Sequence, residues 1–181
     1  MAEPTAYSPL QRWLHWTSAL IVIVMIPMGI YLVARYNAVE FDPITTWLFD
    51  SHKLAGLVVL GLVIVRLCVR LAQGVPSPAG HLSRAQKAAA HAVHLALYGF
   101  LLAMPVVGWI GASAYELNTL PGGLHLPAIV SPDKDMAGRV LYWHYIGGLV
   151  LAGLILLHAG AALYHRFVVK DDVYRRMARW P

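Results

Sequence analysis

The sequence contains few charged residues. Asp, Glu, Lys and Arg together make up 13% of its 181 residues, against about 25% in soluble globular domains. Hydrophobic residues account for 59% of the chain, and the mean hydropathy is +0.59. This composition excludes an ordinary soluble domain and is typical of an integral membrane protein.

Cysteine is almost absent, and acidic residues are absent from the long apolar stretches. The single Cys68 excludes an internal disulfide, and the lack of any Cys-x-x-Cys-His sequence excludes covalent haem attachment of the c type. A proton-coupled or metal transporter is also disfavoured, because no Asp or Glu lies within an apolar stretch to relay protons or bind ions.

The sequence instead has four long apolar stretches. They predict transmembrane helices at about residues 13–34, 52–72, 87–113 and 139–166, each close to the roughly 20 residues that span a bilayer. Pro27 and Pro105 lie within two of them and are expected to kink those helices without ending them. We therefore expect an all-α, integral membrane four-helix bundle that forms a single membrane domain over residues 1–181.

Basic residues fall mainly on one side of this arrangement. If the N-terminus is cytoplasmic, ten of the fourteen Lys and Arg residues lie on that side: Arg12, Arg66, Arg70, Arg84, Lys87, Arg166, Lys170, Arg175, Arg176 and Arg179. The opposite face has Arg35, Lys53, Lys134 and Arg139. The positive-inside rule therefore predicts cytoplasmic N- and C-termini. The first apolar stretch is too long for a cleaved signal peptide, so we expect the first helix to be retained. The net charge of +5 indicates attraction to lipid headgroups, and we expect no nucleic acid as partner.

Nine histidines are unusual in so apolar a chain, since ionisable groups inside spans are costly unless they have a function. His15 and His158 lie in the inner halves of the first and fourth spans, and His52 and His144 lie at the outer ends of the second and fourth. Fourteen helical residues rise about 21 Å and turn through nearly four full turns, so His144 and His158 share a face at two depths. The sequence thus predicts an inner pair, His15 and His158, and an outer pair, His52 and His144.

Each pair is expected to supply the axial ligands of a haem b iron, which gives two haems per chain stacked across the bilayer. Zinc fits less well because it takes four ligands. We expect each ligating imidazole to donate its other N–H to the carbonyl one turn earlier in its own helix. A histidine bonded to a neighbouring carbonyl is the alternative for any one of the four, and it does not explain the paired depths.

Small residues follow these histidines and would either clear space for the porphyrin or permit close helix packing: Gly56, Gly147, Gly148, Ala161 and Ala162.

Other polar residues are candidates for contacts with quinone or with haem propionates. His91 and His94 share one helix face and could serve either purpose or lie at the membrane interface. Arg66, Arg70 and Lys53 could pair with propionates, with snorkelling to the headgroups as the alternative. His165 would complement the dipole at a helix end. No catalytic residue is assigned.

Four sequence patterns together resemble a known family. They are Tyr-Ser-x-Leu-Gln-x-x-x-His-Trp at 7–16, His-x-x-x-Gly with later Val-Arg-Leu and Arg-Leu at 52–71, His-x-x-His with a later Pro-Val-x-Gly at 91–108, and Trp-His with a later His-x-x-Ala-Ala-Leu-x-His at 143–165. In this order, and over essentially the whole chain, they resemble the bacterial cytochrome b561 family. Its members are dihaem four-helix membrane proteins related to the b-type subunits of nickel-iron hydrogenases and formate dehydrogenases, and the compact length is most similar to the superoxide oxidase type.

The resemblance implies the same two histidine pairs as haem ligands and electron transfer to or from membrane ubiquinone in the bacterial inner membrane. The superoxide oxidase type would take electrons from superoxide at the outer face, which would make the chain a superoxide:ubiquinone oxidoreductase. The alternative is an electron-transfer subunit that relays electrons between a dehydrogenase, hydrogenase or c-type cytochrome and quinone, with residues 115–139 as the docking surface. Expected partners are membrane lipid, quinone and a soluble redox protein, with the chain a monomer or homodimer.

Overall fold

The computed structural model describes residues 6–77 and 82–178, which leaves His81 and Arg179 outside the described residues. Four helices dominate it: α1 (Pro9–Val39), α2 (Pro43–Gln73), α3 (Arg84–Ala114) and α4 (Lys134–Tyr164). All four are long and apolar enough to cross a membrane, and they contain the expected spans, except that the last span runs on into the π-helical turn η2 (His165–Val169). Two short elements, η1 (Pro121–Gly123) and α5 (Arg175–Ala178), complete the described structure. The expected all-α bundle is confirmed.

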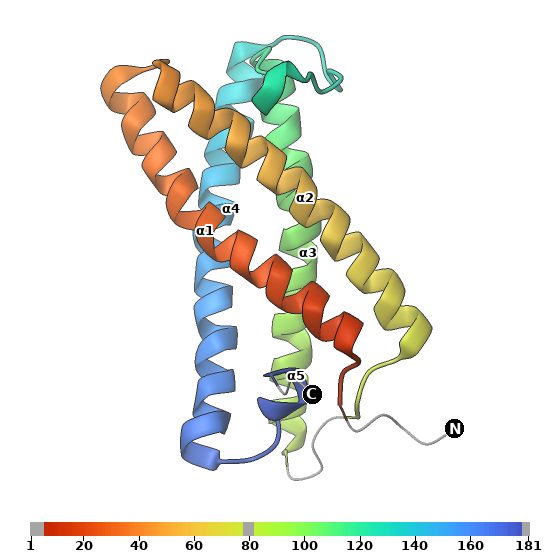
Figure 1. Ribbon diagram of the computed structural model, residues 1–181. Coiled ribbons are helices and arrows are strands. Elements are labelled where there is room, and N and C mark those ends of the chain that lie inside the picture. Colours follow the sequence, from red (N-terminus) through yellow and green to blue (C-terminus); the bar gives the residue numbers. More distant parts are fainter. Residues whose placement is uncertain (1–5, 78–81, 179–181) are drawn as a thin grey trace.

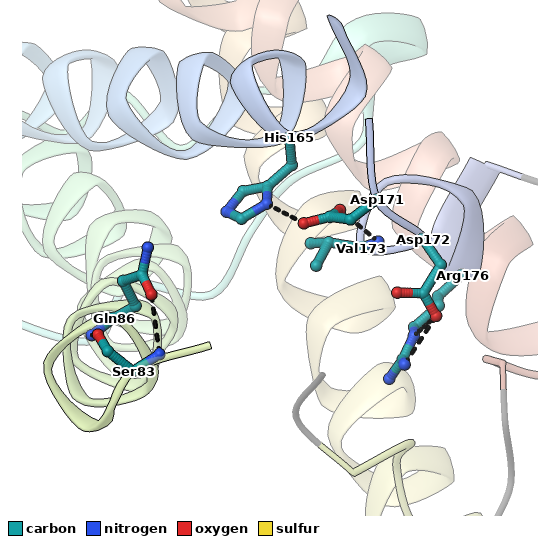
Figure 2. Close-up of polar contacts among 7 residues, drawn as sticks. All are labelled: Ser83, Gln86, His165, Asp171, Asp172, Val173 and Arg176. Atoms are coloured by element: carbon teal, nitrogen blue, oxygen red, sulfur yellow. Dashed lines mark hydrogen bonds and ion pairs between the residues drawn. The ribbon is translucent and has the colours of Figure 1, made fainter. Parts of the chain in front are cut away.

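Local sequence signals explain where the helices begin. Ser8 and Ser83 are N-caps, and each forms a capping box with a glutamine three residues later. Figure 2 shows the Ser83 and Gln86 box, in which the Ser83 N–H donates to the Gln86 side-chain oxygen over 2.8 Å. Both helices that contain an internal proline continue through it, as expected: α1 at Pro27 and α3 at Pro105.

The helices form two antiparallel hairpins. α1 packs along α2 and α3 packs along α4, while α2 contacts α3 and α1 contacts α4. In Figure 1 the α1–α2 hairpin runs obliquely in front of the more upright α3–α4 hairpin. A small core joins the hairpins through Val22, Val59, Val63 and Leu151. Many large apolar side chains elsewhere are exposed, as expected where lipid is the solvent.

The two ends of the bundle differ. One end has the α1–α2 connection and residues 115–133, which we call the outer cap. The other has the start of α1 and the residues after α4, and we call it the inner end. There the Trp16 Nε1 donates to the Met177 carbonyl over 3.1 Å, and the Tyr7 N–H donates to the Arg176 carbonyl over 3.3 Å. The C-terminal residues thus fold back onto α1, so Tyr7 and Met177 lie at the same end. That this end faces the cytoplasm stays a prediction.

Two contacts to aspartate side chains fix the chain after α4. Figure 2 shows the His165 Nδ1 2.6 Å from an Asp171 oxygen, and Arg176 paired with Asp172 at 2.7 Å. His165 therefore has an acidic side chain as its partner, in addition to the helix end that the sequence suggests.

Candidate functional site: two facing histidine pairs

Two pairs of histidine rings face each other across the bundle. His15 on α1 and His158 on α4 have ring centroids 6.2 Å apart and planes inclined by 77°. His52 on α2 and His144 on α4 have centroids 6.1 Å apart and planes inclined by 78°. The structure thus brings together the same inner and outer pairs that helix depth predicts, and each pair joins α4 to the α1–α2 hairpin.

The spacing suits two imidazoles bound on opposite sides of one metal ion. A metal–nitrogen bond is about 2 Å and the binding nitrogen lies roughly 1 Å from the ring centre, so two opposed rings have centroids about 6 Å apart. Within the described residues, no group of three or more His, Cys, Asp or Glu residues could hold a metal ion. Sites with two ligands suit haem iron, whose porphyrin supplies the remaining ligands, better than zinc, which takes four.

A cavity of about 220 Å³ adjoins the outer pair, and mostly apolar side chains line it. At the depth of the rings its wall is formed by glycines from all four helices: Gly29, Gly56, Gly108 and Gly148. Nearer the outer cap it is lined by Phe49, Trp109 and Leu126. An apolar space with two imidazoles at its wall fits a flat, largely apolar porphyrin.

Two of these glycines lie directly against the outer rings. A Cβ atom at Gly29 would be 3.1 Å from Cε1 of His52, and one at Gly108 would be 3.0 Å from Cε1 of His144. The sequence does not reveal the role of either glycine, because each lies on a different helix from the histidine that it neighbours. Gly29 did carry a signal, since it is the only glycine in α1.

The small residues that follow the histidines have different roles. Gly148 lines the cavity, and a Cβ atom there would have nothing within 4 Å, which fits clearance for a ligand. A Cβ atom at Gly147 would be 2.7 Å from the Met104 sulfur, which fits close helix packing. Gly56 does both, since it lines the cavity and a Cβ atom there would be 3.7 Å from the Met25 methyl group. Near the inner pair, Ala161 is exposed and Ala162 is half-buried.

The expected second hydrogen bond of the imidazoles is not formed within their own helices. The Nδ1 atoms of His15, His52 and His144 are buried and have no hydrogen-bond partner within the described residues. The expectation of a bond to the carbonyl one turn earlier is therefore wrong for these three. For His144 the nearby acceptor is the Met104 carbonyl, which lies on α3 and one turn before Gly108.

The inner pair has polar neighbours. The ring of His94 lies 5.2 Å from that of His158 at an inclination of 66°, whereas His91 is exposed. The structure thus separates two histidines that the sequence places on one face. The Arg66 guanidinium lies 5.3 Å from the centre of the Tyr98 ring, and it lines a small inner pocket together with Arg70.

At the outer end, Lys53 is bound to the outer cap. Its ammonium group lies 2.9 Å from Asp50 and donates to the Leu117 carbonyl over 2.7 Å. Thr119 donates to the same Asp50 oxygen over 3.0 Å. Lys53 also lines the cavity, so it remains beside the outer pair, but its charge is already paired.

A second outer cation is paired as well. Arg35 forms an ion pair with Asp42, and this contact holds the pKa of the Asp42 carboxyl well below its usual range, with help from hydrogen bonds to Thr45. Lys134 and Arg139 are exposed and form no ion pair within the described residues. Of the four expected outer cations, two are therefore neutralised locally.

Comparison with known proteins places this geometry in a family. The family model described as "Prokaryotic cytochrome b561" matches residues 6–180. The chain belongs to the prokaryotic cytochrome b561 family. It is therefore a haem b protein of membrane electron transfer, and it is a multi-pass protein of the bacterial inner membrane.

Relatives in this family carry several names. The chain is 29% identical to "Cytochrome b561 homolog 2" of Escherichia coli (strain K12), over 96% of this chain and 92% of that protein. It is 29% identical to "Cytochrome b562" of Cereibacter sphaeroides, over 99% of each. It is 27% identical to "Probable superoxide oxidase CybB" of Yersinia pestis, over 94% of each. The family is thus shared along the whole chain, while the names differ in what they say of the reaction.

Proposed function

We propose that this cytochrome b561 protein holds two haems b and passes electrons from superoxide at its outer face to ubiquinone in the membrane. The observation that carries this proposal is the presence of two facing imidazole pairs, with centroids 6.1 and 6.2 Å apart, that share the single helix α4. Fourteen residues of that helix separate the two levels by about 21 Å. Sites at two depths give electrons a route between the two faces.

The four histidines would bind and orient the haems, with His52 and His144 at the outer level and His15 and His158 at the inner level. Haem b supplies reversible one-electron chemistry when bound. The apolar wall of the outer cavity excludes water, and at the inner end Arg66 and Arg70 would balance propionate charge. Neither arginine forms an ion pair with an acid within the described residues, which leaves both available for that role.

Superoxide is proposed as the donor for two reasons. One relative carries the name of a probable superoxide oxidase, and the exposed Lys134 and Arg139 would attract an anion to the outer face. Two superoxide anions oxidised to O₂ would release two electrons, and one ubiquinone would take up both electrons and two protons to form ubiquinol.

Quinone is proposed to bind at the inner level beside His94, whose ring contacts that of His158. Because His91 is exposed, we expect the two histidines to differ in effect. His94→Ala should slow quinone-dependent reoxidation of the reduced protein severalfold with haem content intact, while His91→Ala should change it little. Equal effects of the two substitutions would argue against a site at His94.

Rapid mixing of the purified protein with superoxide tests the proposed reaction. We expect haem reduction within milliseconds, abolished by added superoxide dismutase, followed by reoxidation when ubiquinone is added. Failure of superoxide to reduce the haems would favour the alternative, an electron-transfer subunit whose soluble partner docks on residues 115–139.

A further inference from the structure

The two outer rings are positioned in the same way by the two hairpins. In each hairpin a glycine of the first helix lies against the histidine ring of the second: Gly29 of α1 against His52 of α2, and Gly108 of α3 against His144 of α4. The ring atom nearest to the missing side chain is Cε1 in both cases. The same contact made twice, once for each ring of one pair, points to a common purpose.

A side chain at either glycine would press on the neighbouring ring. Cβ contacts of 3.0 and 3.1 Å with an aromatic ring are tighter than nine in ten real ones, so the ring would have to yield by a few tenths of an ångström. The Gly108 position is also 3.3 Å from Nδ1 of His144. The two rings therefore occupy their present planes because neither position carries a side chain, and an added Cβ atom would press on the ring edge and tend to turn the ring.

We propose that Gly29 and Gly108 are positioning residues that fix the planes of the two outer imidazoles, and thereby hold the 78° angle between them. The inference rests on the proposed function, because ring orientation acts on the haem only if the outer pair binds one. The planes of axial imidazoles set the splitting of the iron d orbitals, and nearly perpendicular rings give a low-spin ferric spectrum that differs from that of parallel rings. Glycine at these positions therefore tunes the outer haem without touching its iron.

The inner pair offers an internal comparison. Its rings are inclined by 77°, yet its contact with α3 is made by the His94 ring, which lies against His158. The inner angle is thus maintained with a different neighbour. Substitution at Gly29 or Gly108 should leave the inner haem unchanged.

The test is low-temperature electron paramagnetic resonance of the oxidised, haem-loaded protein, with the outer signal identified as the one lost in His144→Ala. Gly108→Ala and Gly29→Ala should each shift the largest g-value of the outer signal, or remove the outer haem alone. The inner signal should stay at its wild-type position.

Two other glycines of α3 provide matched controls. Gly99→Ala places its Cβ where nothing lies within 4 Å, and Gly111→Ala places it 2.5 Å from the Leu141 side chain without meeting an imidazole. Both should retain the wild-type outer signal, Gly111→Ala even if the protein is less stable.

Several results would overturn the inference. A wild-type outer signal in both Gly108→Ala and Gly29→Ala would do so, as would an equal shift in Gly111→Ala, because general helix packing would then be the cause. The inference would also be overturned if Gly29→Ala and Gly108→Ala both failed to accumulate while Gly111→Ala accumulated, because the two glycines would then be needed for folding. If the wild-type protein itself lacks a second haem signal, the proposed function fails instead, so the two failures are distinguishable.

Discussion

The outer and inner histidine pairs have almost the same internal geometry and very different surroundings. Centroid distances differ by a tenth of an ångström and inclinations by one degree. The outer pair adjoins an apolar cavity beside Lys53, whose charge is paired with Asp50, whereas the inner pair lies near Arg66, which forms no ion pair within the described residues, and near a third histidine. If both pairs bind haem through two imidazoles, a difference in redox potential between the two haems must come from the residues around each pair.

This difference predicts a direction for electron flow. Positive charge near a haem favours its reduced form, and Arg66 and Arg70 supply such charge only at the inner level. The inner haem is therefore expected to have the higher potential. Electrons entering at the outer face would then move inward without an energetic penalty.

The largest effect is expected when the outer or the inner site is removed by itself. His144→Ala should eliminate the outer haem and keep the inner one, and His158→Ala should do the reverse, because the two histidines belong to separate ring pairs. Haem content by optical difference spectroscopy should fall by about half in each variant. Loss of all haem in either variant, with α-helix content preserved in circular dichroism, would show that the sites are not separate.

The next prediction concerns charge at the outer end. Lys53→Met leaves Asp50 without its cation and should slow haem reduction by superoxide up to roughly tenfold at low salt, since electrostatic steering contributes factors of about 10 or more. Asp50→Asn frees the Lys53 charge and should accelerate it. Rapid mixing at several salt concentrations measures both. Changes of the same sign in the two variants would point to damage to the outer cap, because both residues hold it.

A smaller effect is expected from the arginine charge at the inner end. Arg66→Gln removes one positive charge near His15 and His158 and should lower the potential of the inner haem by about 40 mV, which corresponds to about 1 kcal/mol for one electron. The outer potential should not change. Arg84→Gln, at the exposed start of α3, is the control for loss of a basic residue at the same end. Redox titration of the three proteins measures the shifts, and equal shifts for both variants would contradict the account.

The smallest effect concerns stability at the outer end. The pKa of Asp42 is lowered in the folded protein by Arg35, so the ion pair stabilises the fold fully above the unfolded Asp value of about 3.9, and this stabilisation is lost progressively as the pH falls from there through the lower folded value. Asp42→Asn keeps a residue that can cap α2 and should reduce thermal stability slightly at pH 7 and by a smaller amount at a pH well below 3.9. A variant that is equally destabilised at both pH values would show that the ion pair is not the cause.

The residues differ in how far the sequence could predict them. The two pairs were predictable because helical rise and rotation fix the relative positions of His144 and His158 on one straight element, and because His15 and His52 lie at matching depths. The contacts of Gly29 and Gly108 were not, since they depend on which helices pack together. The different surroundings of His91 and His94 were not predictable for the same reason. Two residues that are three positions apart share a helix face only approximately, and the packing of the neighbouring helix decides which of the two it contacts.

Polar partners were the least predictable feature. Lys53 could be placed near the outer histidine from sequence, but its bond to the Leu117 carbonyl depends on the path of the outer cap, which has no regular periodicity. Within the described residues, the Nδ1 atoms of His15, His52 and His144 do not form the expected bonds to their own helices, because these rings face a neighbouring helix.

A redox titration of the purified wild-type protein, combined with its haem-to-polypeptide ratio, shows whether the two histidine pairs hold two separate haems. Two haems b per chain are expected to titrate as two one-electron steps, with the component lost in His158→Ala at the higher potential. A single haem per chain, or two haems that both disappear when only one pair is disrupted, would contradict this expectation.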